Sequence, residues 1–127
     1  MPASPDRPPV NLLELEPLAA AALDPSAYDY FRSGAGDELT LGRNRAAFAE
    51  VGLLPRVLVD VSEIDPSTTA LTAELPHPLA VAPTAFHRLA DPEGEIATAR
   101  GAAAAGAPMC LSSLSNTPLE QVADVGG

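Results

Sequence analysis

The stretch "PLAVAPTAFHRLADPEGE", residues 78–95, carries the strongest indication of the fold. Residues 78–82 form an apolar run without polar alternation, which is typical of a strand buried on both faces in a parallel sheet. Asp91 and Pro92 then provide an N-cap and a proline at the first helical position, and Gly106 is placed to end that helix. The stretch predicts a strand, a loop and a helix; on its own, the loop is either a backbone segment that binds a ligand or a proline-rich turn.

The same order of elements follows once more downstream. A second apolar run, "APMCLSS" at residues 107–113, precedes Thr117 and Glu120 at capping-box spacing, with Pro118 at the first helical position. Residues 78–125 therefore predict β-α-β-α, an α/β arrangement with a parallel sheet and right-handed crossovers. Two such units cannot close a sheet, and a (β/α)₈ barrel takes about 250 residues, so we expect a truncated fold.

The chain divides into segments of different composition. Four prolines among residues 1–10 predict a disordered lead-in. Residues 11–53 predict a helical segment, and residues 54–77 predict short strands or a small hairpin. Residues 78–127 hold the two βα units.

Start and stop signals divide the helical segment into three helices. Asn11, Asp24 and Asp37 are the expected starts. Pro17 is expected to kink or interrupt the first helix, and Gly34 to supply the left-handed residue that ends the second.

Composition excludes several functions. Aromatic residues make up 4% of the 127 residues and tryptophan is absent, so the core must be aliphatic. Seven arginines, no lysine and 17 acidic residues give a net charge of −10, which argues against nucleic acid as a partner. The single cysteine, Cys110, cannot form an internal disulfide or a multi-cysteine metal site, and we expect no metal. No signal peptide or membrane span is evident, so we expect a cytoplasmic protein without a membrane partner.

Three segments together resemble the FMN-dependent α-hydroxy acid oxidases and dehydrogenases, the glycolate oxidase and lactate oxidase family. They are "YDYFRSGAGDELTLGRNRAAF" (28–48), "LPRVLVDVSEIDPSTT" (54–69) and the stretch from "PLAVAPTA" to "LEQVA" (78–123). The resemblance implies an FMN flavoprotein on a TIM (β/α)₈ barrel after a helical N-terminal segment. It implies an oxidoreductase that converts a small 2-hydroxy acid to the 2-oxo acid by hydride transfer to the flavin, and a homo-oligomer when intact.

The resemblance also implies residue roles. Tyr30 matches the tyrosine that helps to hold the substrate carboxylate. Pro83, Thr84 and Ala85 match the loop that lies against the flavin, and Ser112 matches a serine whose hydroxyl contacts it. Without the resemblance, a tyrosine in an amphipathic helix is a packing residue, and threonine and serine at strand ends bond the local backbone.

The family's catalytic histidine and substrate-binding arginines belong to later strands, so we expect no catalytic residue in this chain. Neither His77 nor His87 matches that histidine; His87 is expected beside the first loop and His77 at the surface. Two positions depart from the family: Leu114 replaces a usual aromatic, and Thr72 replaces a frequent turn glycine.

The interpretation that follows is an N-terminal fragment of a hydroxy acid oxidising enzyme, inactive as a lone chain. The alternative is a noncatalytic α/β protein whose open strand edges are covered by self-association or by a partner. A separate small α/β binding module is a third possibility, which the Tyr30 segment argues against.

Overall fold

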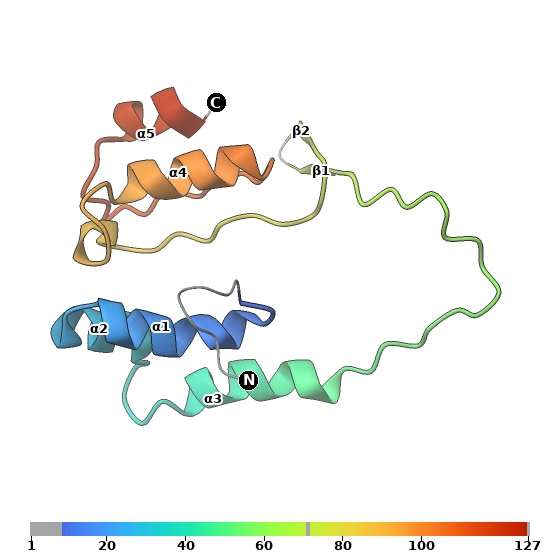
Figure 1. The fold of residues 1–127 in the computed structure, drawn as a ribbon, viewed down its shortest axis with the longest axis horizontal. Coiled ribbons are helices and arrows are strands. Elements are labelled where there is room, and N and C mark those ends of the chain that lie inside the picture. The colour runs from blue at the N-terminus through green and yellow to red at the C-terminus, as the bar shows by residue number, and fades with distance from the viewer. Residues whose placement is uncertain (1–8, 71, 127) are drawn as a thin grey trace. The chain divides into compact units, whose positions relative to one another are not determined.

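The computed structural model describes residues 9–70 and 72–126 (Figure 1). Most of the expected lead-in, residues 1–8, lies outside the described residues. The chain divides into two compact units, residues 1–60 and 61–127, and each is described by itself.

The first unit is helical. It contains a 3-10 turn, η1 (Leu12–Glu14), followed by the helices α1 (Leu15–Ala22), α2 (Pro25–Arg32) and α3 (Leu39–Glu50) (Figure 1). Asn11 Oδ1 accepts a hydrogen bond of 2.9 Å from the Leu13 N–H at the start of η1. Asp24 Oδ1 accepts one of the same length from the Ser26 N–H at the start of α2. The bonds from Ser26 hold the pKa of Asp24 below its usual value.

Two expectations for this unit are wrong. Pro17 does not interrupt a helix, because α1 begins at Leu15 and places the proline in the first turn, where no N–H needs an intrahelical partner. Gly34 is not left-handed; the left-handed residues between α2 and α3 are Gly36 and Glu38, with φ of 55° and 58°. The helix α3 accordingly begins after Glu38.

The second unit opens with the predicted hairpin. Strands β1 (Thr68–Ala70) and β2 (Ala73–Leu75) pair antiparallel, with Thr68 opposite Leu75. Thr72, at the turn, has a left-handed φ of 71°. The threonine there carries a steric penalty that glycine would avoid.

The two apolar runs pair in parallel at one position. Val81 N–H donates to the Pro108 carbonyl, and Cys110 N–H donates to the Val81 carbonyl, each at 2.9 Å. These bonds join Val81 and Met109 in a parallel bridge rather than in two full strands. The expected burial of residues 78–82 on both faces is wrong: Leu79 is 66% exposed and Val81 is half-buried. Both faces of a strand are covered only when helices or other strands pack above and below the sheet, and within the described residues this run has one bridged neighbour, at Met109.

Helices α4 (Glu95–Ala104) and α5 (Leu119–Gly126) follow the two runs and pack on each other (Figure 1). Their contact holds most of the described buried apolar residues, which are all aliphatic: Ala99, Ala102 and Val122. Gly106, with φ of 69°, ends α4 as predicted.

The predicted starts of these two helices are displaced. Asp91 Oδ1 accepts a bond of 2.8 Å from the Glu93 N–H and so caps a turn, while α4 begins at Glu95 instead of Pro92. Thr117 does not form a capping box, because its hydroxyl donates to Glu95. No helix within residues 9–70 and 72–126 is both long enough and apolar enough to cross a membrane.

Candidate functional site

Two loops lie at the same edge of the second unit. The first βα loop, residues 82–94, follows Val81, and the second βα loop, residues 110–118, follows Met109. Because Val81 and Met109 are bridged in parallel, both loops leave the carboxyl ends of neighbouring strands. In barrels of parallel strands this is the edge that carries active sites.

Backbone and side-chain hydrogen bonds tie the two loops together. Phe86 N–H donates to the Leu114 carbonyl at 3.2 Å, and Arg88 N–H donates to Asn116 Oδ1 at 3.3 Å. Phe86 is left-handed, with φ of 56°, which costs about 1–2 kcal/mol for a residue other than glycine. The first loop is therefore held in a strained shape by its contacts to the second.

A buried carboxylate joins both loops to helix α4. Glu95 is 0% exposed, and its Oε1 accepts hydrogen bonds from the N–H groups of His87 (3.3 Å) and Asn116 (3.0 Å). Its Oε2 accepts a bond of 2.8 Å from the Thr117 hydroxyl. Burial raises the pKa of Glu95, but the bonds from Asn116, Thr117, its own N–H and His87 outweigh burial and lower the pKa to about 2. The group is a stable buried anion held by donors from both loops.

Sequence reasoning missed the role of Glu95. It grouped Asp91, Glu93 and Glu95 as acids that complement the dipole of a helix start. Glu93 fits that reading, because its carboxylate is exposed and pairs with Arg100 at 3.0 Å. Nothing in the single sequence separates Glu95 from Glu93, since the donors to Glu95 come from a loop about 20 residues away.

Each of the two histidines forms a hydrogen bond that links two elements of the second unit. His87 lies at the first βα loop, as expected, and its Nδ1 is 2.9 Å from Thr98 Oγ1. His77 is half-buried rather than at the surface, and its Nε2 is 2.8 Å from the Ala105 carbonyl oxygen. A carbonyl can only accept, so Nε2 of His77 carries the proton. That bond fixes the end of the hairpin to the end of α4.

The residues predicted to contact the cofactor lie on the two tied loops. Pro83 and Thr84 are exposed and Ala85 is half-buried. Within the described residues, no hydrogen bond uses the N–H of Thr84 or of Ala85, so both donors are available to a ligand. Ser112 Oγ accepts a bond of 3.1 Å from the Leu114 N–H, which leaves its O–H as a donor. This donor set suits the carbonyl oxygens and ring nitrogens of a flavin.

Tyr30, the predicted substrate residue, lies on α2 in the first unit. Its side chain is 46% exposed, and its ring meets the ring of Phe31 edge to face at a centroid distance of 5.3 Å. The ring contact fits the alternative of a packing tyrosine, while nearly half of the residue's surface remains exposed.

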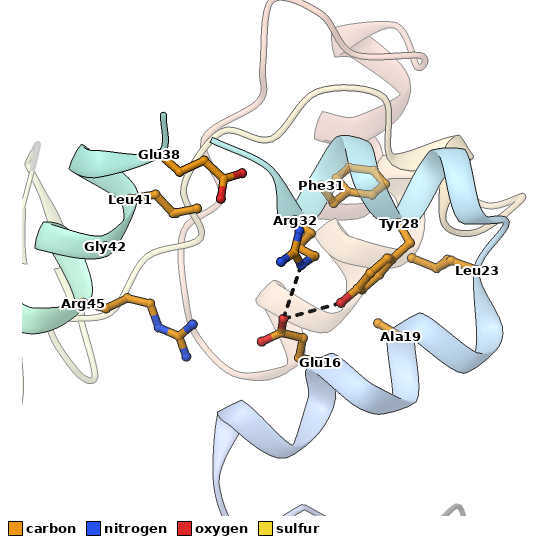
Figure 2. A pocket seen from close by; sticks show the side chains of 10 residues that line it. All are labelled: Glu16, Ala19, Leu23, Tyr28, Phe31, Arg32, Glu38, Leu41, Gly42 and Arg45. Atoms are coloured by element: carbon orange, nitrogen blue, oxygen red, sulfur yellow. Dashed lines mark hydrogen bonds and ion pairs between the residues drawn. The ribbon is translucent and has the colours of Figure 1, made fainter. Parts of the chain in front are cut away.

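A pocket of about 460 Å³ lies between the helices of the first unit (Figure 2). Glu16 Oε1 accepts a bond of 3.4 Å from the Tyr28 hydroxyl and lies 4.0 Å from Arg32 Nε. Figure 2 shows the Glu16 side chain between these two partners. The pocket is lined by Tyr28 and not by Tyr30, so the predicted substrate residue does not belong to it. Within the part of the chain that the structure describes, no group of three or more acidic, histidine or cysteine side chains could hold a metal.

Residues 19–127 match the family described as FMN-dependent dehydrogenase. The chain belongs to this family. Among the curated relatives, it is 54% identical over 118 residues to an L-lactate oxidase of Nostoc sp., which covers 93% of this chain and 32% of the relative. It is 49% identical over 116 residues to glycolate oxidase 1 of Zea mays, covering 91% of this chain and 31% of the relative.

Solved structures agree with this assignment. A mandelate oxidase superposes with a TM-score of 0.90 at 38% identity, covering 94% of this chain and 35% of that one. A mandelate oxidase variant with a C4a-OH-FMN adduct gives a TM-score of 0.86 at 38% identity, covering 90% and 35%. These neighbours are FMN-dependent oxidases with the TIM-barrel fold, so the predicted α/β class and FMN as the family cofactor are confirmed. The chain spans about a third of the length of the relatives that it matches.

Proposed function

We propose that the chain is the N-terminal part of an FMN-dependent enzyme that oxidises a small 2-hydroxy acid to the 2-oxo acid. The observation that carries the proposal is the pair of tied βα loops, which leave the N–H groups of Thr84 and Ala85 and the O–H of Ser112 as donors at one edge. The similar proteins are named for oxidation of lactate, glycolate and mandelate, which are all small 2-hydroxy acids.

FMN, when bound, supplies an acceptor for the hydride equivalent that leaves the hydroxyl-bearing carbon of the substrate. This chain's own residues hold and orient the ring. Pro83 fixes the backbone angle at the start of the first βα loop, and the N–H groups of Thr84 and Ala85 donate to the polar edge of the flavin. Ser112 donates its hydroxyl from the second loop, while its lone pair stays on the Leu114 N–H.

Tyr30 holds one oxygen of the substrate carboxylate through its hydroxyl in this proposal. The ring contact with Phe31 limits the directions in which the hydroxyl can point, so little side-chain entropy is lost on binding. The neutral phenol supplies a hydrogen bond rather than a countercharge, and in this proposal the charge of the carboxylate is met by the arginines that the family resemblance assigns to later strands.

The chain alone is proposed to be inactive. One ring nitrogen of each histidine is bound, Nε2 of His77 to the Ala105 carbonyl and Nδ1 of His87 to Thr98, and neither histidine matches the family's catalytic histidine. The remaining two thirds of the family fold are needed for the base and for the arginines that grip the substrate. A cytoplasmic location and homo-oligomeric assembly of the complete enzyme stay predictions.

A chimera tests this proposal. Residues 1–127 are joined to the C-terminal two thirds of the Nostoc L-lactate oxidase, in place of its own N-terminal third. We expect the purified chimera to retain FMN and to oxidise L-lactate or glycolate, while the 127-residue chain shows no turnover. A folded chimera without flavin would overturn the proposal. If the isolated chain were in addition a defined oligomer, the noncatalytic alternative would hold instead.

A further inference from the structure

We propose that Glu95 is a positioning residue for the cofactor, which sets the two βα loops at the separation that the flavin requires. The inference rests on the proposed function, because it assigns a role to Glu95 in the same site. Glu95 does not touch the flavin in this proposal; it acts through the backbone of His87 and Asn116 and the side chain of Thr117.

The arrangement of donors is the first argument. One oxygen of the carboxylate accepts one N–H from each loop, at 3.3 Å from His87 and 3.0 Å from Asn116. A movement of either loop away from the other would break one of these bonds. The second oxygen accepts the Thr117 hydroxyl at 2.8 Å and fixes the residue at which the second loop leads into α5. Glu95 thus links both loops and both helices at one point.

Burial and charge are the second argument. Glu95 is 0% exposed and Thr117 is 3% exposed, so the carboxylate and its hydroxyl donor are shielded from water. No arginine or histidine of the described residues forms an ion pair with Glu95, so hydrogen bonds from the two loops and from its own N–H stabilise its charge. Hydrogen bonds to a buried, unpaired anion are strong, and a carboxylate left with fewer donors would be costly. The loops therefore stay in the one arrangement that satisfies Glu95.

The place of the linked residues is the third argument. His87 comes two residues after Ala85, and Asn116 comes four residues after Ser112. Between them, the bond from the Phe86 N–H to the Leu114 carbonyl closes a further link between the loops. The donors proposed for the flavin therefore lie immediately before the residues that Glu95 holds, and a shift of those residues is passed directly to Thr84, Ala85 and Ser112.

The experiment compares Glu95 with its exposed neighbour. In the FMN-loaded chimera, Glu95→Ala is expected to raise the Kd for FMN at least about tenfold and to change the shape of the bound flavin's visible absorption band. Glu93→Ala is the matched control, because Glu93 lies two residues away, is exposed, and forms an ion pair with the exposed Arg100. It is expected to leave the Kd and the spectrum unchanged. An unchanged Kd in folded Glu95→Ala would overturn the inference.

Conservative variants separate positioning from a merely structural role. Glu95→Gln can still accept both N–H bonds with its oxygen and donate its amide to Thr117 Oγ1, so we expect it to restore most of the FMN affinity. Thr117→Val removes one of the three bonds from the loops to Glu95 and should raise the Kd severalfold, whereas Thr117→Ser should not. If all four variants lowered thermal stability but none changed the Kd or the spectrum, Glu95 would be structural only.

A measurement without flavin keeps the inference separate from the proposed function. Amide hydrogen exchange of the 127-residue chain is followed at Phe86, whose N–H donates to the Leu114 carbonyl across the loops, and at Ala102 in the core of α4. Glu95→Ala is expected to speed exchange at Phe86 at least about tenfold while leaving Ala102 unchanged. Loss of flavin in the unsubstituted chimera would refute the proposed function alone; unchanged exchange at Phe86 would refute the positioning role alone.

Discussion

The Glu95 carboxylate and the Thr117 hydroxyl form a hydrogen bond of 2.8 Å between residues 22 positions apart, and both side chains are buried. Each residue had a local interpretation in the sequence, as a helix-dipole acid and as a helix cap. In the structure the two satisfy each other instead. Glu95 and Thr117 therefore act together in a tertiary contact between the start of α4 and the second βα loop, instead of each stabilising the start of its own helix.

The first prediction concerns acid stability. The pKa of Glu95 is lowered from 4.5 to about 2 in the folded chain, so its carboxylate stabilises the fold fully above about pH 4.5. That contribution, about 3 kcal/mol at most, is lost as the pH falls from 4.5 toward 2. Urea unfolding at pH 7, 4.5 and 2.5 should show that the unsubstituted chain loses more free energy of unfolding than Glu95→Gln. Equal losses in both would contradict the role assigned to this carboxylate.

The second prediction concerns the turn of the hairpin. Thr72→Gly should raise the free energy of unfolding by about 1 kcal/mol, because Thr72 has a φ of 71° that glycine adopts without strain. Thr69→Gly is the matched control in β1, where the Thr69 hydroxyl donates to Glu74 Oε1 at 2.8 Å, and it should lower stability. The two midpoints of thermal unfolding should move in opposite directions.

The third prediction compares Gly101, inside α4, with Gly106, which follows the end of α4. Gly106→Ala should lower the free energy of unfolding by at least about 1–2 kcal/mol, because Gly106 is left-handed and a Cβ there would lie 2.7 Å from Pro76 Cγ. Gly101→Ala should raise it by about 0.5–1 kcal/mol, since Gly101 is inside the helix and a Cβ meets no atom within 4 Å. Denaturant unfolding of both variants measures these changes in the free energy of unfolding. A Gly106→Ala variant that is more stable than the unsubstituted chain would show that α4 does not end as described.

The fourth prediction concerns the cofactor loop. In the chimera, Ser112→Ala should weaken FMN binding about tenfold, because it removes both the proposed donor to the flavin and the bond to the Leu114 N–H. Ser113→Ala is the control, since Ser113 is exposed and adjacent. The Kd for FMN of each variant is measured from the change in flavin fluorescence as FMN is titrated with the apoprotein. Equal constants for the two variants would remove Ser112 from the site.

Local signals in the sequence predicted where helices and turns occur better than they predicted which residues are buried or in contact. The hairpin and the stop of α4 at Gly106 follow from turn chemistry within a few residues, and both are present. Pro17 was misjudged because the sequence does not mark the change from η1 to α1, which moves the proline into a first turn. Such boundaries depend on one or two residues.

Burial and long-range contacts could not be predicted in the same way. The apolar run 78–82 indicates a strand made for a covered sheet, whereas its exposure depends on neighbours that the described residues do not include. The role of Glu95 depends on donors in another loop. The family resemblance, by contrast, extends over nearly the whole chain, and comparison with known proteins confirms it.

The central claim is that residues 1–127 provide one part of an FMN site for 2-hydroxy acid oxidation, and flavin reduction tests it most directly. The chimera with the C-terminal two thirds of the Nostoc L-lactate oxidase is mixed without oxygen with L-lactate or glycolate, and the visible absorbance of the flavin is followed. We predict a yellow protein whose flavin band bleaches on addition of the 2-hydroxy acid. A folded chimera that is colourless, or one whose bound flavin stays oxidised with both acids, would contradict the account.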